Sequence, residues 1–273
     1  MCRVLNVSRS GYYDWLKRLE RPSPRTAQDL ELVKEIQTIH HDFGYYGAPR
    51  IHQELLARSH HVGRHRVARL MRINGIKAAR CKIKSRPRAA PPSRRPEIVD
   101  LVQRDFHADV PNALWFTDAT QIRTGEGWLW AVVVIDAFSR EVVSWATASQ
   151  ESPKTALTAL RDAIRTRRPP HGCIIQSDRG YQFTAKDWLD LAAGNGLQVS
   201  IGERKSCYDN AVMESWFASF KNEEIYPKGI PFTRQEARSR LFQYVWDYNT
   251  KRLHSALGYV PPCVYATESS TCP

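Results

Sequence analysis

The sequence has no long hydrophobic run and no secretory leader. Its longest apolar stretch, from Trp128 to Ile135, has the length of a strand and falls well short of the roughly 18 apolar residues of a membrane-spanning helix. The first residues, MCRVLNVSRSGYYDW, contain no apolar segment of the kind that directs secretion. We therefore expect no membrane partner and a cytoplasmic protein.

The cysteines do not form a recognisable disulfide or metal-binding motif. Six of them, at positions 2, 81, 173, 207, 263 and 272, include no C-x-x-C pair, which argues against a disulfide framework and a zinc ribbon. The pairs His40-His41 and His60-His61 could suggest zinc, but only Cys81 lies near them. Solvated helix ends are the simpler interpretation of both pairs.

The positive charge is concentrated in one part of the chain. The 273 residues carry a net charge of +12, and residues 1–100 hold 21 Lys and Arg against 9 Asp and Glu. Residues 101–273 hold 19 of each sign. This asymmetry predicts an N-terminal part that contacts a polyanion such as nucleic acid, because Lys and Arg that neutralise phosphates release counterions. A basic surface that is merely solvated is the alternative.

A basic helix-turn-helix is predicted over residues 49–81. IHQELLA and RHRVARLMRING have helical periodicity, and a turn with Gly63 joins them. The arginines of the second helix lie largely off its apolar stripe, so we expect them to be free to contact DNA: Arg64, Arg66, Arg69 and Arg72. A helical hairpin with a solvated basic face is the alternative. Residues 1–48 are expected to form a separate helical region with a second, clipped helix-turn-helix.

Residues 82–98 are predicted to be an extended linker between domains. The stretch KIKSRPRAAPPSRRP holds four prolines among six Lys and Arg, a composition that excludes a helix or a central strand. Its charge is suited to a DNA backbone.

A catalytic core is predicted over residues 99–229, followed by a C-terminal helical extension over 230–273. The predicted elements, in order, are strands at 112–123, from 128 and from 141, a helix at 153–167, a strand at 172–177, a helix at 185–195, a strand at 197–201 and a helix from about Asn210. This order is that of the ribonuclease H-like fold, an α/β mixed five-stranded sheet with flanking helices.

On that fold, three carboxylates are expected to lie close together. Asp118 lies in the first strand, Asp178 ends the fourth, and Glu214 lies in the first turn of the last core helix. The first and fourth strands are neighbours there and the helix covers the same edge, so we expect convergence. Mutual repulsion would raise the pKa of each group, and divalent cations such as Mg²⁺ would relieve it. Two ions could hold the attacking and leaving oxygens of a phosphodiester displacement. Asp178 taken alone is equally typical of a turn.

The residues around these carboxylates are interpreted as structural. Asn210 or Asp209 is expected to cap the helix that carries Glu214. Asp136 is interpreted as a hairpin-turn residue, with a supporting role at the metal as the minority alternative. Gly180 is expected to allow an unusual backbone angle or a close approach of DNA.

The chain resembles the integrase-core protein of the insertion-sequence three family, the product of its second reading frame, which is related to retroviral integrases. The stretches that carry this resemblance are WFTDATQI, GWLWAVVVIDAFSREVVSW, SDRGYQF, SCYDNAVMESWFASFKNE and, ahead of the core, YYGAPRIHQELLARSHHVGRHRVARLMRINGI. Asp178 and Glu214 are separated by 35 residues, a spacing shared by retroviral integrases and one large group of bacterial transposases.

The resemblance implies a D-D-E transposase that binds double-stranded DNA at the ends of its element, frees a 3′-hydroxyl and joins it to another phosphodiester. Its metal ligands would be Asp118, Asp178 and Glu214, with two Mg²⁺ ions and Mn²⁺ able to substitute. Lys221 would contact the DNA end, with a solvated lysine as the alternative. Arg204 and Lys205 would grip phosphate from a loop beside the site.

The resemblance also implies a homo-oligomer on DNA, association with the nucleoid, and an upstream reading-frame product as partner or frameshift fusion. Two rival functions stay open at this point. A non-catalytic DNA-binding regulator, or an inactive remnant, would leave the carboxylates idle. A ribonuclease H-like nuclease would cut without joining.

Overall fold

The computed structural model describes residues 7–20, 23–79, 98–202 and 210–270, and the chain divides into two compact units, Met1–Arg80 and Cys81–Pro273. Each unit is described by itself. The predicted linker lies almost wholly outside the described residues. No helix in the described ranges is long and apolar enough to cross a membrane.

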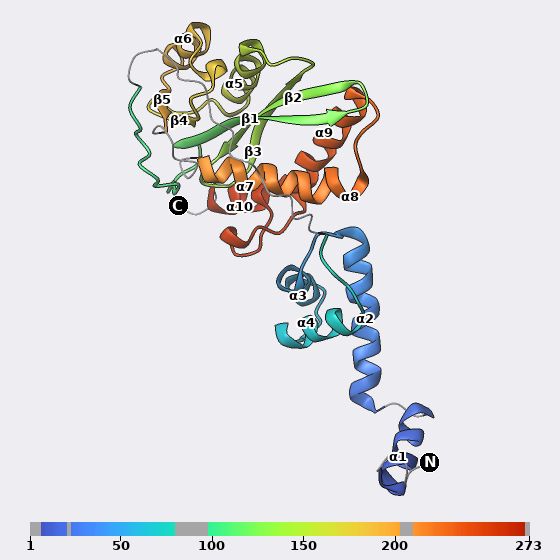
Figure 1. Ribbon diagram of the computed structural model, residues 1–273. Helices are drawn as coiled ribbons and strands as arrows, with labels where there is room; N and C mark the ends of the chain where they lie inside the picture. Colours follow the sequence, from blue (N-terminus) through green and yellow to red (C-terminus); the bar gives the residue numbers. More distant parts are fainter. Residues whose placement is uncertain (1–6, 21–22, 80–97, 203–209, 271–273) are drawn as a thin grey trace. The chain divides into compact units, whose positions relative to one another are not determined.

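The first unit is helical (Figure 1). It contains α1 (Arg9–Glu20), α2 (Pro24–Asp42), α3 (Ala48–Ala57) and α4 (Arg64–Ile73). The predicted helix-turn-helix is confirmed as α3 and α4. Helix α2 starts sharply because Pro24 occupies its first turn and the Ser23 hydroxyl accepts the Thr26 N–H at 3.2 Å.

Helix α2 belongs with the helix-turn-helix. Its Leu32, Ile36 and Ile39 are buried, as are Ile51 of α3 and Leu70 of α4, and α2 contacts both of these helices. Within the predicted region 1–48, α2 therefore packs with the helix-turn-helix, because its apolar stripe supplies one wall of the small core.

The second unit is built on one mixed sheet. Its strands are β1 (Leu114–Thr124), β2 (Gly127–Asp136), β3 (Val142–Ala148), β4 (Ile174–Ser177) and β5 (Gln198–Ile201). Their spatial order is β3-β2-β1-β4-β5. The first three strands pair antiparallel, whereas β4 runs parallel to both β1 and β5. The predicted ribonuclease H-like sheet is confirmed, with strand boundaries shifted by at most two residues.

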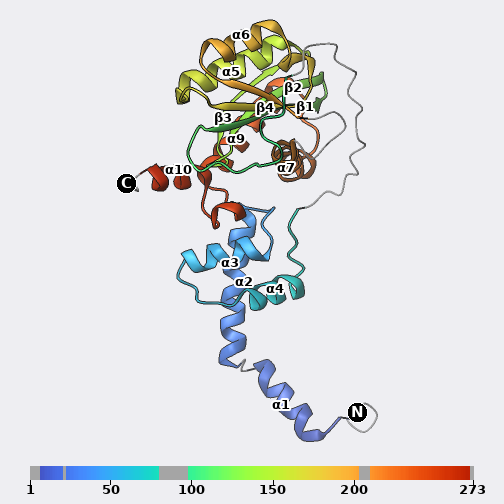
Figure 2. The same cartoon turned by 90° about the vertical axis from the view of Figure 1, so that its left-hand side faces the viewer.

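Helices cover both faces of this sheet (Figure 2). On one face lie α5 (Pro153–Arg167) and α6 (Lys186–Gly194), which follows the short η1 (Tyr181–Phe183). On the other face lie α7 (Ala211–Phe220) and α9 (Arg234–Thr250). Trp115 packs in the α5 and α6 layer, while Leu114 and Phe116 pack in the α7 and α9 layer, as the two-residue period of a strand requires.

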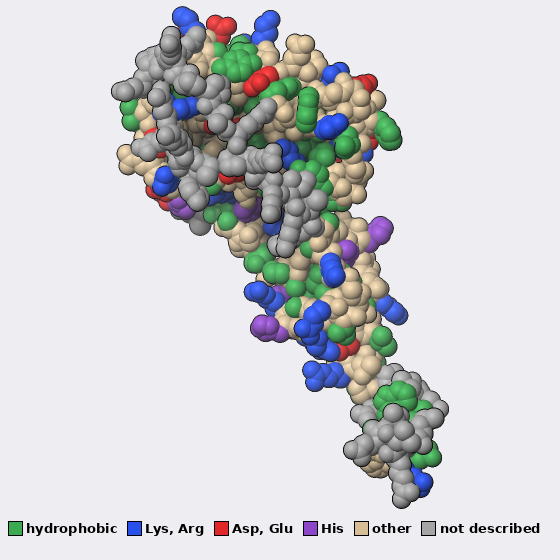
Figure 3. Space-filling model, viewed as in Figure 1, with side chains coloured by type: hydrophobic (Ala, Val, Ile, Leu, Met, Phe, Trp, Pro, Cys, Tyr) green, Lys and Arg blue, Asp and Glu red, His purple; other side chains and the backbone are tan. Residues whose placement is uncertain are grey.

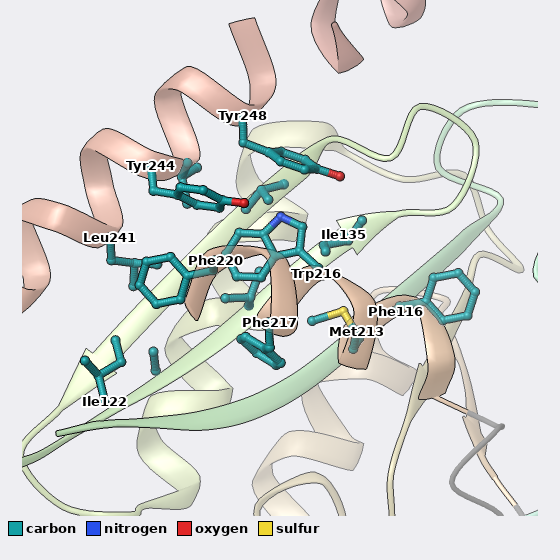
Figure 4. Packing of buried hydrophobic residues seen from close by; sticks show 14 of the residues in the cluster. Phe116, Ile122, Ile135, Met213, Trp216, Phe217, Phe220, Leu241, Tyr244 and Tyr248 are labelled. Atoms are coloured by element: carbon teal, nitrogen blue, oxygen red, sulfur yellow. The ribbon is translucent and has the colours of Figure 1, made fainter. Parts of the chain in front are cut away.

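The chain after α7 stays in contact with the core. A short π-helical segment, η3 (Lys221–Ile225), leads into α8 (Tyr226–Lys228), and η4 (Ser255–Leu257) and α10 (Pro262–Ser270) follow α9. Tyr244 and Tyr248 of α9 pack against Trp216 of α7, with ring centroids 5.7 and 5.9 Å apart (Figure 4). Helix α9, within the predicted C-terminal extension, thus packs into the core of the second unit.

A buried ion pair holds η3 to the segment after α9. Arg252 donates from Nε and Nη2 to the two carboxylate oxygens of Glu223, at 2.9 and 2.6 Å, and the Tyr244 hydroxyl donates to the same carboxylate at 3.0 Å. The side chains of Arg252 and Glu223 are only 5% and 9% exposed. Both charges are therefore out of water and depend on each other.

Arg252→Met is expected to lower the free energy of unfolding by about 3–5 kcal/mol, because it leaves the Glu223 carboxylate buried without its cation. Urea unfolding followed by tryptophan fluorescence measures the change. Lys186→Met is the control, since Lys186 pairs with Asp190 on the surface. Equal effects of the two substitutions would contradict this account, and Glu223→Gln should recover part of the Arg252→Met loss.

Candidate functional site

The register of two parallel strands positions Asp118. Phe116 of β1 pairs with Gln176 of β4, so two residues further along each strand Asp118 and position 178 lie at the same level. Asp118 shares a strand face with Phe116, which packs in the layer of α7. Its carboxylate is half-buried and accepts the Ala119 N–H at 2.7 Å.

Asp178 begins the turn that follows β4. It is exposed, and its Oδ1 accepts the Gly180 N–H at 2.8 Å. Gly180 has an ordinary φ of −58°, so the expected unusual backbone angle is wrong. Glycine is needed there because a Cβ would lie 2.8 Å from Asp178 Oδ1 and 2.5 Å from Gln182 Nε2. The turn therefore fixes the position of the Asp178 carboxylate.

Glu214 lies in the first turn of α7 and is exposed. The opposite side of the helix anchors it, because Met213, Trp216, Phe217 and Phe220 are buried in the layer beneath. Helix α7 contacts β1, the strand that carries Asp118. The three predicted acidic residues therefore come from three elements that meet at one edge of the sheet.

The pKa of Asp118 reflects both its burial and its acidic neighbours. Burial raises the pKa of Asp118 well above its ordinary value, the negative charges of Asp178 and Glu214 raise it further, and the Ala119 N–H and Lys221 oppose the rise. Burial also raises the pKa of Asp178, against the hydrogen bond from Gly180, and the pKa of Glu214. Only Asp118 is influenced by the other two carboxylates, whereas desolvation alone raises the pKa of Asp178 and of Glu214.

The carboxylates do not form a closed metal cage. Within the described residues, no three His, Cys, Asp or Glu side chains lie close enough together to hold a metal ion as they stand. The three carboxylates carry like charges, so a closer approach would require positive charge between them. The donors are carboxylate oxygens, the ligands that Mg²⁺ prefers, and the raised pKa of Asp118 fits a site completed by a divalent cation.

Lys221 lies close enough to Asp118 for each charge to influence the pKa of the other. Burial lowers the pKa of its ammonium group, and the charge of Asp118 opposes that change. The side chain is partly buried, at the junction where α7 passes into η3. A solvated lysine does not describe this residue, because the largest influence on its pKa is loss of water.

Asn210 and Asp136 were both predicted to have structural roles. Asn210 occupies the N-cap position of α7 but makes no side-chain capping bond, so the predicted cap is wrong for Asn210, while Asp209 lies outside the described residues. Both atoms of its amide are buried and without a partner in the described part of the chain, one helical turn before Glu214. Asp136 is confirmed as a turn residue, because it accepts the N–H groups of Asn112 and Ser139, each at 2.9 Å.

The predicted DNA-contacting arginines of α4 divide into two classes. Arg64 and Arg72 are exposed. Arg66 and Arg69 instead pair with Asp29 of α2, at 2.7 and 2.6 Å, and the two arginines hold the pKa of Asp29 below its ordinary value, against burial. These two arginines are therefore not free as we expected, because α2 brings a carboxylate to them. Lys and Arg side chains gather over this region of the helical unit (Figure 3).

Some predicted residues lie outside the described residues, namely Arg204, Lys205 and Asp209. Asn249, near the end of α9, has a structural role within the second unit. Asn249 accepts the N–H of Val142 at 2.9 Å and donates to its carbonyl at 3.0 Å, which covers part of the edge strand β3.

Comparisons with known proteins agree with both units. Models of the Integrase core domain match residues 108–207 and 195–262, and a model of an HTH-like domain matches residues 27–84. The intasome of simian T-cell lymphotropic virus, solved in complex with PP2A regulatory subunit B56 gamma, has a TM-score of 0.53 at 16% identity. That alignment covers 87% of this chain and 76% of the viral one, and it shows the fold alone.

Sequence relatives are much closer. The insertion element IS600 uncharacterized 31 kDa protein of Shigella sonnei is 36% identical over 269 residues, which is 97% of each chain. Transposase InsF for insertion sequence IS3A of Escherichia coli (strain K12) is 36% identical over 96% of this chain and 91% of its own. With the integrase core and the helix-turn-helix region both matched, the chain belongs to the IS3 family of insertion-sequence transposases.

Proposed function

We propose that this transposase cuts and joins DNA ends at Asp118, Asp178 and Glu214 by metal-dependent phosphoryl transfer. The observation that carries the proposal is the register of β1 on β4, which puts Asp118 and position 178 at one level beside α7, the helix of Glu214. The pKa of Asp118, raised by burial and by the charges of the other two carboxylates, supports it. Such a cluster costs free energy unless positive charge is supplied to it, and nothing in the core packing needs it.

The three carboxylates would hold two Mg²⁺ ions, for which Mn²⁺ is expected to substitute. The ions, when bound, would stabilise the charge that develops on the attacking and leaving oxygens. Lys221 would hold a phosphate oxygen beside Asp118, and its partial burial would strengthen that contact. Gly180 keeps the Asp178 carboxylate against its own turn and so limits its freedom.

The reaction proceeds without a covalent enzyme intermediate. In the first step a water oxygen attacks phosphorus, and the bond from phosphorus to the 3′-oxygen breaks to leave a 3′-hydroxyl. In the second step that hydroxyl attacks another phosphorus and displaces its 3′-oxygen. One phosphodiester bond breaks as one forms in the joining step, so joining requires no energy-rich cofactor.

The helical unit would bring double-stranded DNA to this site. Arg64 and Arg72 are the free cations of α4 and would contact phosphates or base edges, whereas Arg66 and Arg69 would serve first to hold α4 on α2. A homo-oligomer on DNA and an upstream reading-frame product, as partner or fusion, complete the proposal. Neither of these partners is needed to explain the folded chain.

Asp118→Asn, Asp178→Asn and Glu214→Gln are each expected to lower cleavage and joining by about 10³-fold or more, because each removes one ligand charge. Labelled DNA carrying the element's end is assayed in Mg²⁺, with and without the upstream product fused, and Asp190→Asn is the control with an exposed carboxylate. Cutting without joining would indicate a nuclease. Binding without cutting by the wild-type chain, both alone and fused, would indicate a regulator or an inactive remnant.

Asp118→Asn is expected to be more stable than the wild type near neutral pH when divalent cations are chelated. The pKa of Asp118 is raised in the folded protein, so the stability associated with its protonated form is lost as pH rises through that pKa. The difference should shrink as pH falls toward the ordinary Asp value of 3.8, and also when Mg²⁺ is added. Thermal melts across pH measure it, and an Asn variant that is less stable at every pH would contradict the raised pKa.

Arg64→Ala and Arg72→Ala are each expected to weaken DNA binding at all sequences and to reduce the slope of log K against log salt by about 1. Arg66→Ala should mainly lower the melting temperature of the helical unit, because Asp29 loses one of its two partners. Fluorescence anisotropy over a salt series, with melts of each variant, separates the two classes. Equal loss of slope in Arg66→Ala with an unchanged melt would show that its pair with Asp29 opens on DNA.

A further inference from the structure

A cavity of about 280 Å³ lies beside the candidate catalytic carboxylates, on a different flank of α7. Its apolar surface comes from Ile135 of β2, from Ala211 and Val212 of α7, and from Ala256 in η4. Its polar surface includes Arg140, Ser215, Ser219 and Trp216. The cavity is thus enclosed by the β2–β3 turn, the helix that carries Glu214, and the chain that follows α9.

One hydrogen-bond donor in this cavity has no partner. Trp216 is 3% exposed, and its indole Nε1–H donates to no group in the described part of the chain. In Figure 4 the indole nitrogen lies on the side of the ring that faces Tyr248, another residue of the cavity wall. A buried donor left unpaired costs about 1–3 kcal/mol, so this donor is the kind of group that a ligand acceptor would satisfy.

Arg140 directs a second donor group to the same cavity at the expense of backbone strain. It has a φ of +60°, in the left-handed region where Gly or Asn is the usual residue. Its Nη2 donates to the Phe106 carbonyl at 3.1 Å, which holds the guanidinium in place. The backbone conformation of this turn does not by itself favour arginine, because Gly or Asn would adopt it with less strain.

The lining selects for a small ligand that carries acceptors. No carboxylate lines the cavity, while the indole N–H, the Arg140 guanidinium and the serine hydroxyls can all donate. The volume of about 280 Å³ is just below the range of sites for drug-sized ligands, roughly 300–1,000 Å³, and suits a single planar ring. Nucleobases offer such a ring, with acceptor atoms on their edges and apolar faces.

The position of the cavity points to the same ligand. The cavity reaches the first turn of α7, where Ala211 and Val212 line it just before Glu214 and Ser215 lines it just after. From there it extends to Trp216, on the side of the helix opposite Glu214. A DNA strand with a phosphate at the carboxylates would pass its next nucleotides along this flank. We propose that the cavity receives one unstacked base of the DNA end, next to the phosphate that is cut.

This proposal rests on the proposed function, because it requires a DNA end at the carboxylates. Extruding a base from a duplex costs a few kcal/mol, which contacts in the cavity would offset. The base would stack against the apolar surface and accept hydrogen bonds from Trp216 and Arg140. Strand distortion near the cut would then be a property of the protein and not of the DNA sequence alone.

The first test fills the cavity. Ser219→Phe is compared with Ala193→Phe, which places the same ring on an exposed site of α6, away from α7. Both are assayed on an intact element end and on duplexes that carry one abasic site at each position near the cut in turn. Ser219→Phe should reduce cleavage of the intact end by about tenfold or more, and an abasic site at one position should restore it, because no base then needs the cavity.

The second test removes a donor and keeps the turn. Arg140→Asn preserves a residue that tolerates the left-handed conformation, and a thermal melt checks the fold. In Ca²⁺, without cleavage, this variant should bind the intact end several-fold more weakly than the wild type does. On the duplex with the restoring abasic site, the wild type and the variant should bind equally.

The outcomes separate this proposal from the function on which it rests. Wild-type cleavage together with equal cleavage by Ser219→Phe and Ala193→Phe would overturn the cavity proposal and leave the transposase chemistry intact. Loss of cleavage that no abasic site restores, together with loss of oligomers in light scattering, would assign the cavity to a second copy of the chain and would also overturn it. If the wild type cuts nothing, the Ca²⁺ binding comparison decides the cavity proposal alone.

Discussion

The parallel pairing of β1 with β4 is the constraint on which the catalytic unit depends. Because Phe116 lies opposite Gln176, Asp118 and Asp178 reach the same level of the sheet although 59 residues separate them. The two-residue period of β1 then puts Asp118 on the face that α7 covers. A shift of register by one residue would send Asp118 to the face of α5 and α6 and leave Glu214 without it.

A cluster of acids with raised pKa values destabilises the fold that holds it, so the surrounding structure must supply the difference. It does so chiefly through aromatic packing between α7 and α9, where Trp216 contacts Phe220, Tyr244 and Tyr248. The buried pair of Glu223 and Arg252 adds a specific link just past Lys221, the cation of the site. Rigid support on one side of α7 allows Glu214 on the other side to stay exposed, available to a metal and a substrate.

The helical unit shows how one acidic residue changes the meaning of a basic surface. Asp29 of α2 engages two of the four arginines that the pattern of α4 presents to solvent. Those two side chains gain a fixed position, and the Asp29 carboxylate partly compensates their positive charge. Arg64 and Arg72 remain as the exposed arginines of α4 outside this pair. The number of Lys and Arg residues in a sequence therefore overstates the positive charge that the folded surface presents to a phosphate.

The sequence by itself determined the order of elements in the sheet and the helix-turn-helix, and it predicted the three acidic residues, because strand alternation, helical periodicity and local motifs are properties of neighbouring residues. Only the tertiary structure decided that α2 pairs with two arginines of α4, that the Asn210 amide turns inward rather than capping α7, and that α9 packs into the core. It also revealed the cavity beside α7 and the unpaired indole of Trp216. These features depend on contacts between residues far apart in the chain, and a local pattern carries no information about the partner that burial will bring.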